Sequence, residues 1–198
     1  MGDRLVQKNQ ELSILNRIAA ALNREVDLHQ ALHVALGNIV DLFNLDTGWI
    51  FLLDEDTEKF YTAATIGLPP ALADHPRRMG GTCYCIDAYV DGEMEGAANI
   101  AAITCSRLKD LKAGTEGLRY HASIALNTQD KQLGILNVAS TDWREISAAE
   151  LRLLHTIGDL MSIAIERARL FQRSTELGAT QERNRIAREL HDTIAQGL

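Results

Sequence analysis

The spacing of apolar residues predicts two helices at the start of the chain. Leucine and isoleucine recur at intervals of three, four or seven residues over residues 5–22 and again over residues 28–43. A polar break at residues 23–27 separates the two runs. Because the outer positions of the first run are charged or polar, it fits either the end of a coiled coil or a helix that caps a domain.

A β-hairpin is predicted next, where aromatic and β-branched residues replace the helical spacing. It joins residues 46–53 to residues 58–67 through a short polar turn. Pro69 and Pro70 stop the second strand and open a long segment, residues 70–119, for which we predict irregular structure.

A second hairpin and a long helix complete the pattern. The hairpin joins residues 120–127 to residues 132–140, and Gly134 marks a bend or a close approach of another backbone. Ser147 and Glu150 then form a predicted capping box ahead of a run with helical spacing. No proline occurs between residues 165 and 185, so we predict that this helix continues without a break.

This order of elements predicts an α+β domain in which an antiparallel sheet packs against helices on one face. A chain of 198 residues with 46% hydrophobic content has room for one such domain and a long helix. The net charge of −7 argues against nucleic acid as the main partner. Because there is neither a long apolar run nor a signal peptide, we expect no membrane span and a cytoplasmic location.

The last seventeen residues combine a helical pattern with residues suited to phosphoryl transfer. One stripe of the predicted helix is apolar and consists of Ile186, Leu190, Ile194 and Leu198. His191 lies at its edge, where a neutral imidazole could attack the γ-phosphorus of ATP while Asp192 holds the other ring nitrogen. Gln196 lies one turn beyond Asp192, where its amide could orient a water for hydrolysis of phosphohistidine.

The run E-R-N-R-I-A-R-E-L-H-D-T-I-A-Q-G-L at residues 182–198 resembles the H-box of two-component sensor histidine kinases. The resemblance implies that His191 is the phosphoacceptor, Asp192 its orienting base and Gln196 a phosphatase residue. It also implies a response regulator as partner and a separate domain that binds ATP. We therefore expect the chain to be part of a longer protein. The alternative is a solvated amphipathic helix with an incidental histidine.

The second hairpin, S-I-A-L-N-T-Q-D-K-Q-L-G-I-L-N-V-A-S, and the helix after it resemble the end of a GAF domain. GAF domains are sensors of small molecules and of redox state. The resemblance divides the chain into an N-terminal signalling helix (residues 1–24), a GAF sensor domain (25–171), and a linker helix with the start of a dimerisation and phosphotransfer domain (172–198).

Three cysteines fall within 23 residues of the insert: Cys83, Cys85 and Cys105. Cys83 and Cys85 share one face if the segment is extended. Three converging thiolates could hold a three-iron cluster, or a four-iron cluster with one open or foreign ligand. His75 or His121 could supply a fourth ligand for a two-iron cluster. The alternatives are buried core thiols, a zinc site or a thiol switch.

The segment G-G-T-C-Y-C with a later C-S-R-L is similar to the cysteine arrangement of GAF-containing sensor kinases that carry an oxygen- or redox-sensitive iron–sulfur cluster. The resemblance implies a cluster on Cys83, Cys85 and Cys105 that controls phosphorylation of His191. The alternative is a module that binds an organic ligand or haem and dimerises through its last helix. Five histidines could be axial haem ligands, with nothing to distinguish one: His29, His33, His75, His121 and His155.

A parallel homodimer is predicted along the last helix, from Ser147 to Leu198. Leu170 and Leu177 lie seven residues apart on one seam. Because Ser174, Gln181 and Asn184 share that seam, we expect the dimer to be weak in this chain.

Overall fold

The computed structural model describes residues 2–24, 27–94, 100–101, 107–108, 113–141 and 146–196. Within these ranges, the side chains of residues 2–7, 10, 100–101 and 189–196 are not described. The chain divides into two compact units, Met1–Ala164 and Ile165–Leu198. No helix in the described ranges is long and apolar enough to cross a membrane.

The two predicted N-terminal helices are present as α1 (Gly2–Arg24) and α2 (Leu28–Leu42). The first helix extends to Arg24, into the polar break predicted at residues 23–27, of which residues 25–26 lie outside the described residues. Asp27 caps α2, because its carboxylate accepts a hydrogen bond of 2.8 Å from the backbone N–H of Gln30.

The centre of the first unit is a five-stranded sheet in the order β2-β1-β5-β4-β3, with every neighbouring pair antiparallel. The strands are β1 (Thr47–Leu53), β2 (Phe60–Ile66), β3 (Ile100–Ala101), β4 (Tyr120–Asn127) and β5 (Gln132–Ser140). Both predicted hairpins are confirmed, and the strand ends of the second are those predicted from the sequence.

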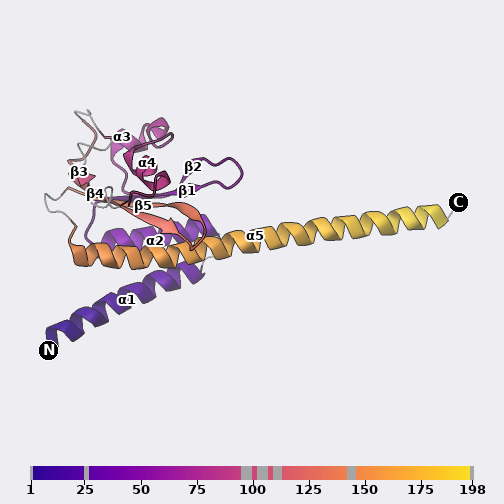
Figure 1. The fold of residues 1–198 in the computed structure, drawn as a ribbon, viewed down its shortest axis with the longest axis horizontal. Helices are drawn as coiled ribbons and strands as arrows, with labels where there is room; N and C mark the ends of the chain where they lie inside the picture. The colour runs from indigo at the N-terminus through magenta and orange to yellow at the C-terminus, as the bar shows by residue number, and fades with distance from the viewer. Residues whose placement is uncertain are drawn as a thin grey trace. The chain divides into compact units, whose positions relative to one another are not determined.

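One face of the sheet is covered by α2 and by the beginning of the last helix (Figure 1). Gly48 of β1 lies so close to α2 that an added Cβ would sit 2.8 Å from Leu36. On β4, Ile124 would lie 3.0 Å from a Cβ added at Gly158 of the last helix. The apolar side chains on this face form the larger part of the core.

The opposite face is also covered, so the prediction of helices on one face only was wrong. Figure 1 shows α3 (Pro70–Ala73) and α4 (Tyr84–Val90) on the side of the sheet away from α2. The insert is therefore not irregular throughout, and it also holds the 3-10 helix η1 (Pro76–Arg78). Periodicity did not reveal α4, because seven residues give only two turns in which to repeat a pattern.

The last helix, α5 (Ala148–Gln196), runs without a break, as predicted. Its capping box is present. The Ser147 backbone N–H donates to the Glu150 carboxylate at 2.8 Å, and the Glu150 N–H donates to the Ser147 hydroxyl at 3.3 Å.

Gly134 provides a test of the packing in the middle of the sheet. A Cβ added there would lie 2.1 Å from the backbone oxygen of Phe51, so Gly134→Ala must displace β1 or β5. We expect this change to lower the free energy of unfolding by about 1 to 3 kcal/mol. As a control, Gly178→Ala in α5 meets no atom within 4 Å and should be neutral or stabilising by up to about 1 kcal/mol. Urea unfolding of both variants measures the difference.

Candidate functional site

The C-terminal end of α4 is fixed to the sheet by the phenol of Tyr89. Its hydroxyl donates a hydrogen bond of 2.9 Å to the carbonyl of Leu126 and accepts one of 3.1 Å from the N–H of Gly134. The side-chain amide of Gln132 donates to the backbone carbonyl of Tyr89 at 3.0 Å. Because these partners lie on β4 and β5, the end of α4 cannot shift without breaking bonds to both strands.

Two thiols meet at the N-terminal end of α4. Cys83 is the N-cap residue, and Cys85 lies in the first turn, so the premise of an extended segment was wrong for Cys85. Their sulfurs nevertheless interact, because the Cys85 thiol donates a hydrogen bond to Cys83. The Cys85 sulfur also lies 3.0 Å from Nε2 of His121 on β4. Both cysteines are buried, and neither forms a disulfide.

A buried arginine, Arg107, stands beside the two thiols. Its guanidinium donates hydrogen bonds to the backbone carbonyls of Arg78, Gly80 (2.9 Å) and Gly81 (3.2 Å). The guanidinium carbon lies 4.9 Å from the centre of the Phe51 ring, within range of a cation–π interaction. The arginine therefore holds the glycine loop that leads into α4.

The surroundings of Cys83 favour its thiolate. The hydrogen bond from Cys85 lowers the pKa of Cys83 most, and the charge of Arg107 and the backbone N–H of Ile86 lower it further, to about 6. Burial acts in the opposite direction but is outweighed. The Cys83 thiolate is thus the anion that accompanies the buried Arg107 cation.

His121 is held neutral, because burial lowers its pKa to about 4. The S–H of Cys85 already donates to Cys83, so the Cys85 sulfur can only accept from His121. The neutral imidazole therefore donates its Nε2–H to the Cys85 sulfur. This tautomer leaves Nδ1 as an acceptor, and Nδ1 is a buried atom without a hydrogen-bond partner. One chain of hydrogen bonds therefore runs from His121 through Cys85 to Cys83.

Further polar groups lie on the same face of the sheet. Trp49, Asn137 and Ser123 stand in one row across β1, β5 and β4. The Ser123 hydroxyl donates to the Asn137 carbonyl at 2.8 Å, whereas the Asn137 amide nitrogen and the Trp49 indole nitrogen are buried without partners. Buried donors of this kind call for an explanation, such as a bound polar molecule or ordered water.

The structure brings together two of the three cysteines predicted as metal ligands, Cys83 and Cys85. Cys105 lies outside the described residues. Among the side chains that are described, no group of three His, Cys, Asp or Glu residues is placed to hold a metal ion. His121 reaches Cys85, whereas His75 is exposed.

Sequence reasoning did not identify Arg107 or Trp49 as site residues. Arg107 has no spacing relation to the cysteine pair, and its role depends on contacts with residues 26 to 29 positions away. Trp49 was assigned to a strand. Because this strand is buried on both faces, its apolar residues do not alternate with polar ones, and the sequence does not show toward which face the Trp49 side chain points.

His191, Asp192 and Gln196 all lie within α5, where the predicted helix is present. Their side chains are not described, so their proposed roles stay predictions. Just before them, Arg185 pairs with Glu182 at 2.6 Å on the exposed surface of the helix. Because both side chains are exposed to water, this pair contributes little to helix stability.

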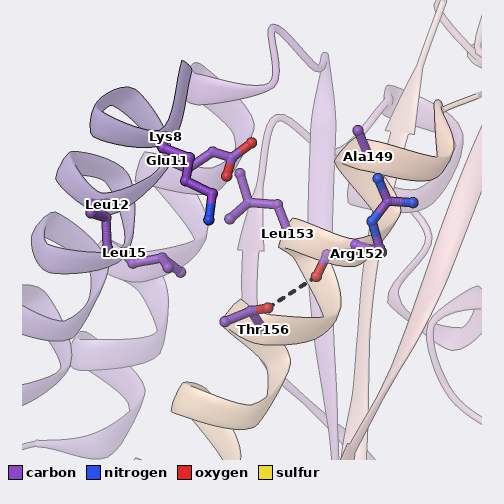
Figure 2. Close-up of a pocket in the computed structure, with 8 residues that line it drawn as sticks. All are labelled: Lys8, Glu11, Leu12, Leu15, Ala149, Arg152, Leu153 and Thr156. Carbon is purple, nitrogen blue, oxygen red and sulfur yellow. Dashed lines mark hydrogen bonds between the residues drawn. The ribbon is translucent and has the colours of Figure 1, made fainter. Parts of the chain in front are cut away.

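A groove of about 340 Å³ lies between α1 and the beginning of α5, where Leu153 projects toward α1 (Figure 2). It is lined by Lys8, Glu11, Leu12, Leu15, Ala149, Arg152, Leu153 and Thr156. Leu12 is 56% exposed there. None of these lining residues is a predicted catalytic or metal-binding residue, and the groove is separate from the cysteine site.

The lowered pKa of Cys83 predicts that stability depends on pH. Folded Cys83 ionises near pH 6 and an unfolded cysteine near pH 9, so this contribution is complete above pH 9 and is lost as the pH falls to about 6. The slope cannot exceed about 1.4 kcal/mol per pH unit. In urea unfolding, Cys83→Ser should flatten the slope between pH 6 and 9.

His121 supplies the control for that measurement. Because burial lowers its pKa from 6.5 to about 4, its contribution is lost as the pH falls from 6.5 toward 4. His121→Asn should therefore reduce the slope between pH 6.5 and 4 and keep the slope above pH 7. If Cys83→Ser retains the full slope between pH 6 and 9, Cys83 is not the titrating group.

Comparison with known proteins agrees with this architecture. Residues 25–166 match the GAF domain family, and residues 182–198 match a histidine kinase family. The chain is 35% identical over 195 residues to the sensor histidine kinase YhcY of Bacillus subtilis strain 168. That match covers 96% of this chain and 51% of YhcY, so the chain spans about half the length of this relative.

Two solved structures share the fold. The GAF domain of a phosphoenolpyruvate-protein phosphotransferase from Coxiella burnetii has a TM-score of 0.66 at 20% identity, covering 83% of this chain and 97% of that one. The corresponding domain from Acinetobacter has a TM-score of 0.63 at 21% identity, covering 82% and 96%. Since the GAF family match covers well over half of the 198 residues, the chain belongs to the GAF domain family.

Proposed function

We propose that this chain is the sensory and phosphoacceptor portion of a two-component sensor histidine kinase. The observation that carries the proposal is the order of the two family matches: a GAF domain at residues 25–166, followed by a histidine kinase match at residues 182–198. The helix α5 contains the end of the first match and nearly all of the second. One continuous helix thus connects the end of the GAF domain to His191.

In this proposal His191 accepts the γ-phosphoryl group of ATP, which is bound by a separate domain of the whole protein. Asp192 holds the far ring nitrogen of His191 and fixes the tautomer that attacks phosphorus. Gln196 orients a water for dephosphorylation, and a response regulator receives the phosphoryl group. The activity, the bound ATP and the response regulator belong to the whole protein. The relative YhcY is about twice as long as the region that matches this chain.

The test is autophosphorylation of a longer form that includes the ATP-binding domain. Incubation with ATP should give an acid-labile, base-stable phosphoprotein, and His191→Gln should abolish the label. His155→Gln is the matched control, because His155 is an exposed histidine on the same helix and should keep the label. Label that persists in His191→Gln rules out His191 as the acceptor. Gln196→Ala should spare labelling and slow dephosphorylation by roughly ten- to a hundredfold.

We also propose that the chain forms a parallel homodimer through α5. Ile163, Leu170 and Leu177 recur every seven residues and are 64%, 55% and 63% exposed. An exposed apolar seam with this repeat is typical of a coiled-coil interface. Thr156, which lines the groove between α1 and α5, lies seven residues before Ile163 and extends the seam.

The dimer prediction is tested by placing a charge on the seam. Leu177→Lys should weaken self-association at least roughly tenfold in sedimentation equilibrium, because a buried lysine at such a position opposes pairing. Thr175→Lys adds the same charge about 200° around the helix and should leave the dimer intact. A monomer in the unaltered chain at high concentration would contradict the proposal.

The signal that the GAF domain senses is the more specific part of the proposal. On the iron–sulfur hypothesis, Cys83, Cys85 and Cys105 hold a three- or four-iron cluster whose state sets kinase activity. It is supported by the convergence of Cys83 and Cys85 and depends on Cys105. Anaerobically purified protein should then be brown and contain iron and acid-labile sulfide, and Cys83→Ser should remove both. Colourless protein with no iron after anaerobic reconstitution would exclude a cluster.

A polar organic ligand is the second candidate signal, and a specific observation favours it. The unpartnered nitrogens of Trp49, Asn137 and His121 all lie on the face of the sheet beneath α4. A bound molecule with hydrogen-bonding groups could satisfy them. Such a ligand should raise the thermal unfolding midpoint of the chain, and Asn137→Leu should abolish that shift. A shift retained in Asn137→Leu would place the ligand elsewhere.

A further inference from the structure

The groove between α1 and α5 has two walls with the same spacing of residues. On α1 the lining residues are Lys8, Glu11, Leu12 and Leu15. On α5 they are Ala149, Arg152, Leu153 and Thr156. In both sets the members lie three, four and seven residues after the first, which places them along one face of a helix. Each helix therefore lines the groove with a single stripe of its surface (Figure 2), and all eight residues belong to the first compact unit.

The stripe of α1 is buried at one end of the helix and exposed at the other. Ile18 and Leu22 continue it toward the C-terminus of α1 and are 1% and 4% exposed. Beside the groove, Leu15 is partly buried and Leu12 is 56% exposed. The domain thus covers the C-terminal half of the stripe and leaves apolar surface in contact with water at the groove. An exposed apolar groove flanked by charged residues is typical of a surface that a partner helix covers.

The seam proposed for dimerisation along α5 supplies only one of the two apolar rows that a coiled coil needs. In a two-stranded coiled coil, two positions of each heptad are apolar. Ile163, Leu170 and Leu177 fill one of them. The positions three and four residues after each of these are polar or charged: Glu166, Arg167, Arg173, Ser174, Thr180 and Gln181. Two α5 helices alone would therefore pair weakly, and a stable dimer needs further apolar surface.

We propose that the groove holds α1 of a second copy of this chain, so that two α1 helices and the beginnings of two α5 helices form a four-helix interface. The inference rests on the homodimer proposed above and names a further surface for it. The groove is continuous with the α5 seam, because Thr156 lines it and lies seven residues before Ile163. In a two-fold interface the same patch meets itself. Leu12 of each copy therefore enters the groove of the other and covers Leu15 and Leu153.

The charges that line the groove suit a second copy. Lys8 and Arg152 are basic and Glu11 is acidic. In the part of the chain that the structure describes, none of the three forms a salt bridge. A two-fold axis places Glu11 of one copy opposite Arg152 of the other, and the reverse pair forms at the same time. Opposite charges that face each other in this way fix the register of the two copies more than they add affinity.

A charge placed in the groove tests this interface. Leu12→Lys should weaken self-association of the full chain at least roughly tenfold in sedimentation equilibrium, because a lysine at the centre of the interface opposes pairing. Ser13→Lys is the matched control. It adds the same charge about 100° around the helix, at an exposed position, and should leave the dimer intact. Because Leu12 is exposed in the single chain, the circular dichroism spectrum of Leu12→Lys should be unchanged.

An exchange of charges supplies a second test. Glu11→Arg and Arg152→Glu should each weaken the dimer roughly threefold, because each places like charges opposite one another across the two-fold axis. The variant that carries both changes should recover the affinity of the unaltered chain, since opposite charges then face each other again. If the two changes acted only within their own helices, their effects would instead add in the double variant.

The proposal is overturned if Leu12→Lys associates as tightly as the unaltered chain, or if the double charge variant is no tighter than the single ones. Leu177→Lys separates the two surfaces: a dimer that this change disrupts and Leu12→Lys does not is formed by α5 alone. A chain that does not self-associate at high concentration contradicts both this inference and the homodimer. Phosphorylation of His191 is measured separately in the longer form, so the outcome for the kinase proposal is independent.

Discussion

The structure depends on the burial of β5 from both sides. Residues 133–140 are all buried, and their side chains alternate between the core beneath α2 and the core beneath α4. A central strand of this kind requires cover on each face, which explains why the insert supplies α4 as well as loops. The cysteine site and the beginning of α5 consequently lie on opposite faces of a single sheet, separated by the thickness of one layer of strands.

A buried cation accounts for much of the local structure around the cysteines. Removing a guanidinium from water is unfavourable unless hydrogen bonds and an opposite charge replace the solvent. Arg107 meets this requirement with three backbone carbonyls, the Phe51 ring and the Cys83 sulfur. The loop, the strand β1 and the N-terminus of α4 are thereby joined through one side chain.

Much of the fold could be predicted from the sequence, because its long elements repeat their patterns many times. The second hairpin and the capping box at Ser147 were identified correctly. Gly134 was predicted to mark a bend or a close approach, and the structure shows a close approach to the backbone of Phe51. The helix α4 was missed, because its cap residue is a cysteine without a side-chain capping bond and its length allows little periodicity.

The candidate site was predictable only in part. Spacing suggested that Cys83 and Cys85 act together, and their sulfurs do meet. The partners that determine their chemistry, Arg107 and His121, come from segments more than twenty residues away, and no local pattern connects them to the cysteines. A long-range contact of this kind depends on how the chain folds over the sheet.

The two ends of α4 are fastened by bonds of different chemical character. At one end the Tyr89 phenol joins β4 and β5 through hydrogen bonds between uncharged groups. At the other end the Cys85 sulfur contacts the imidazole of His121, and Arg107 binds the loop that leads into the helix. The sulfurs and the buried cation are therefore confined to one end of α4, while hydrogen bonds between uncharged groups hold the other end.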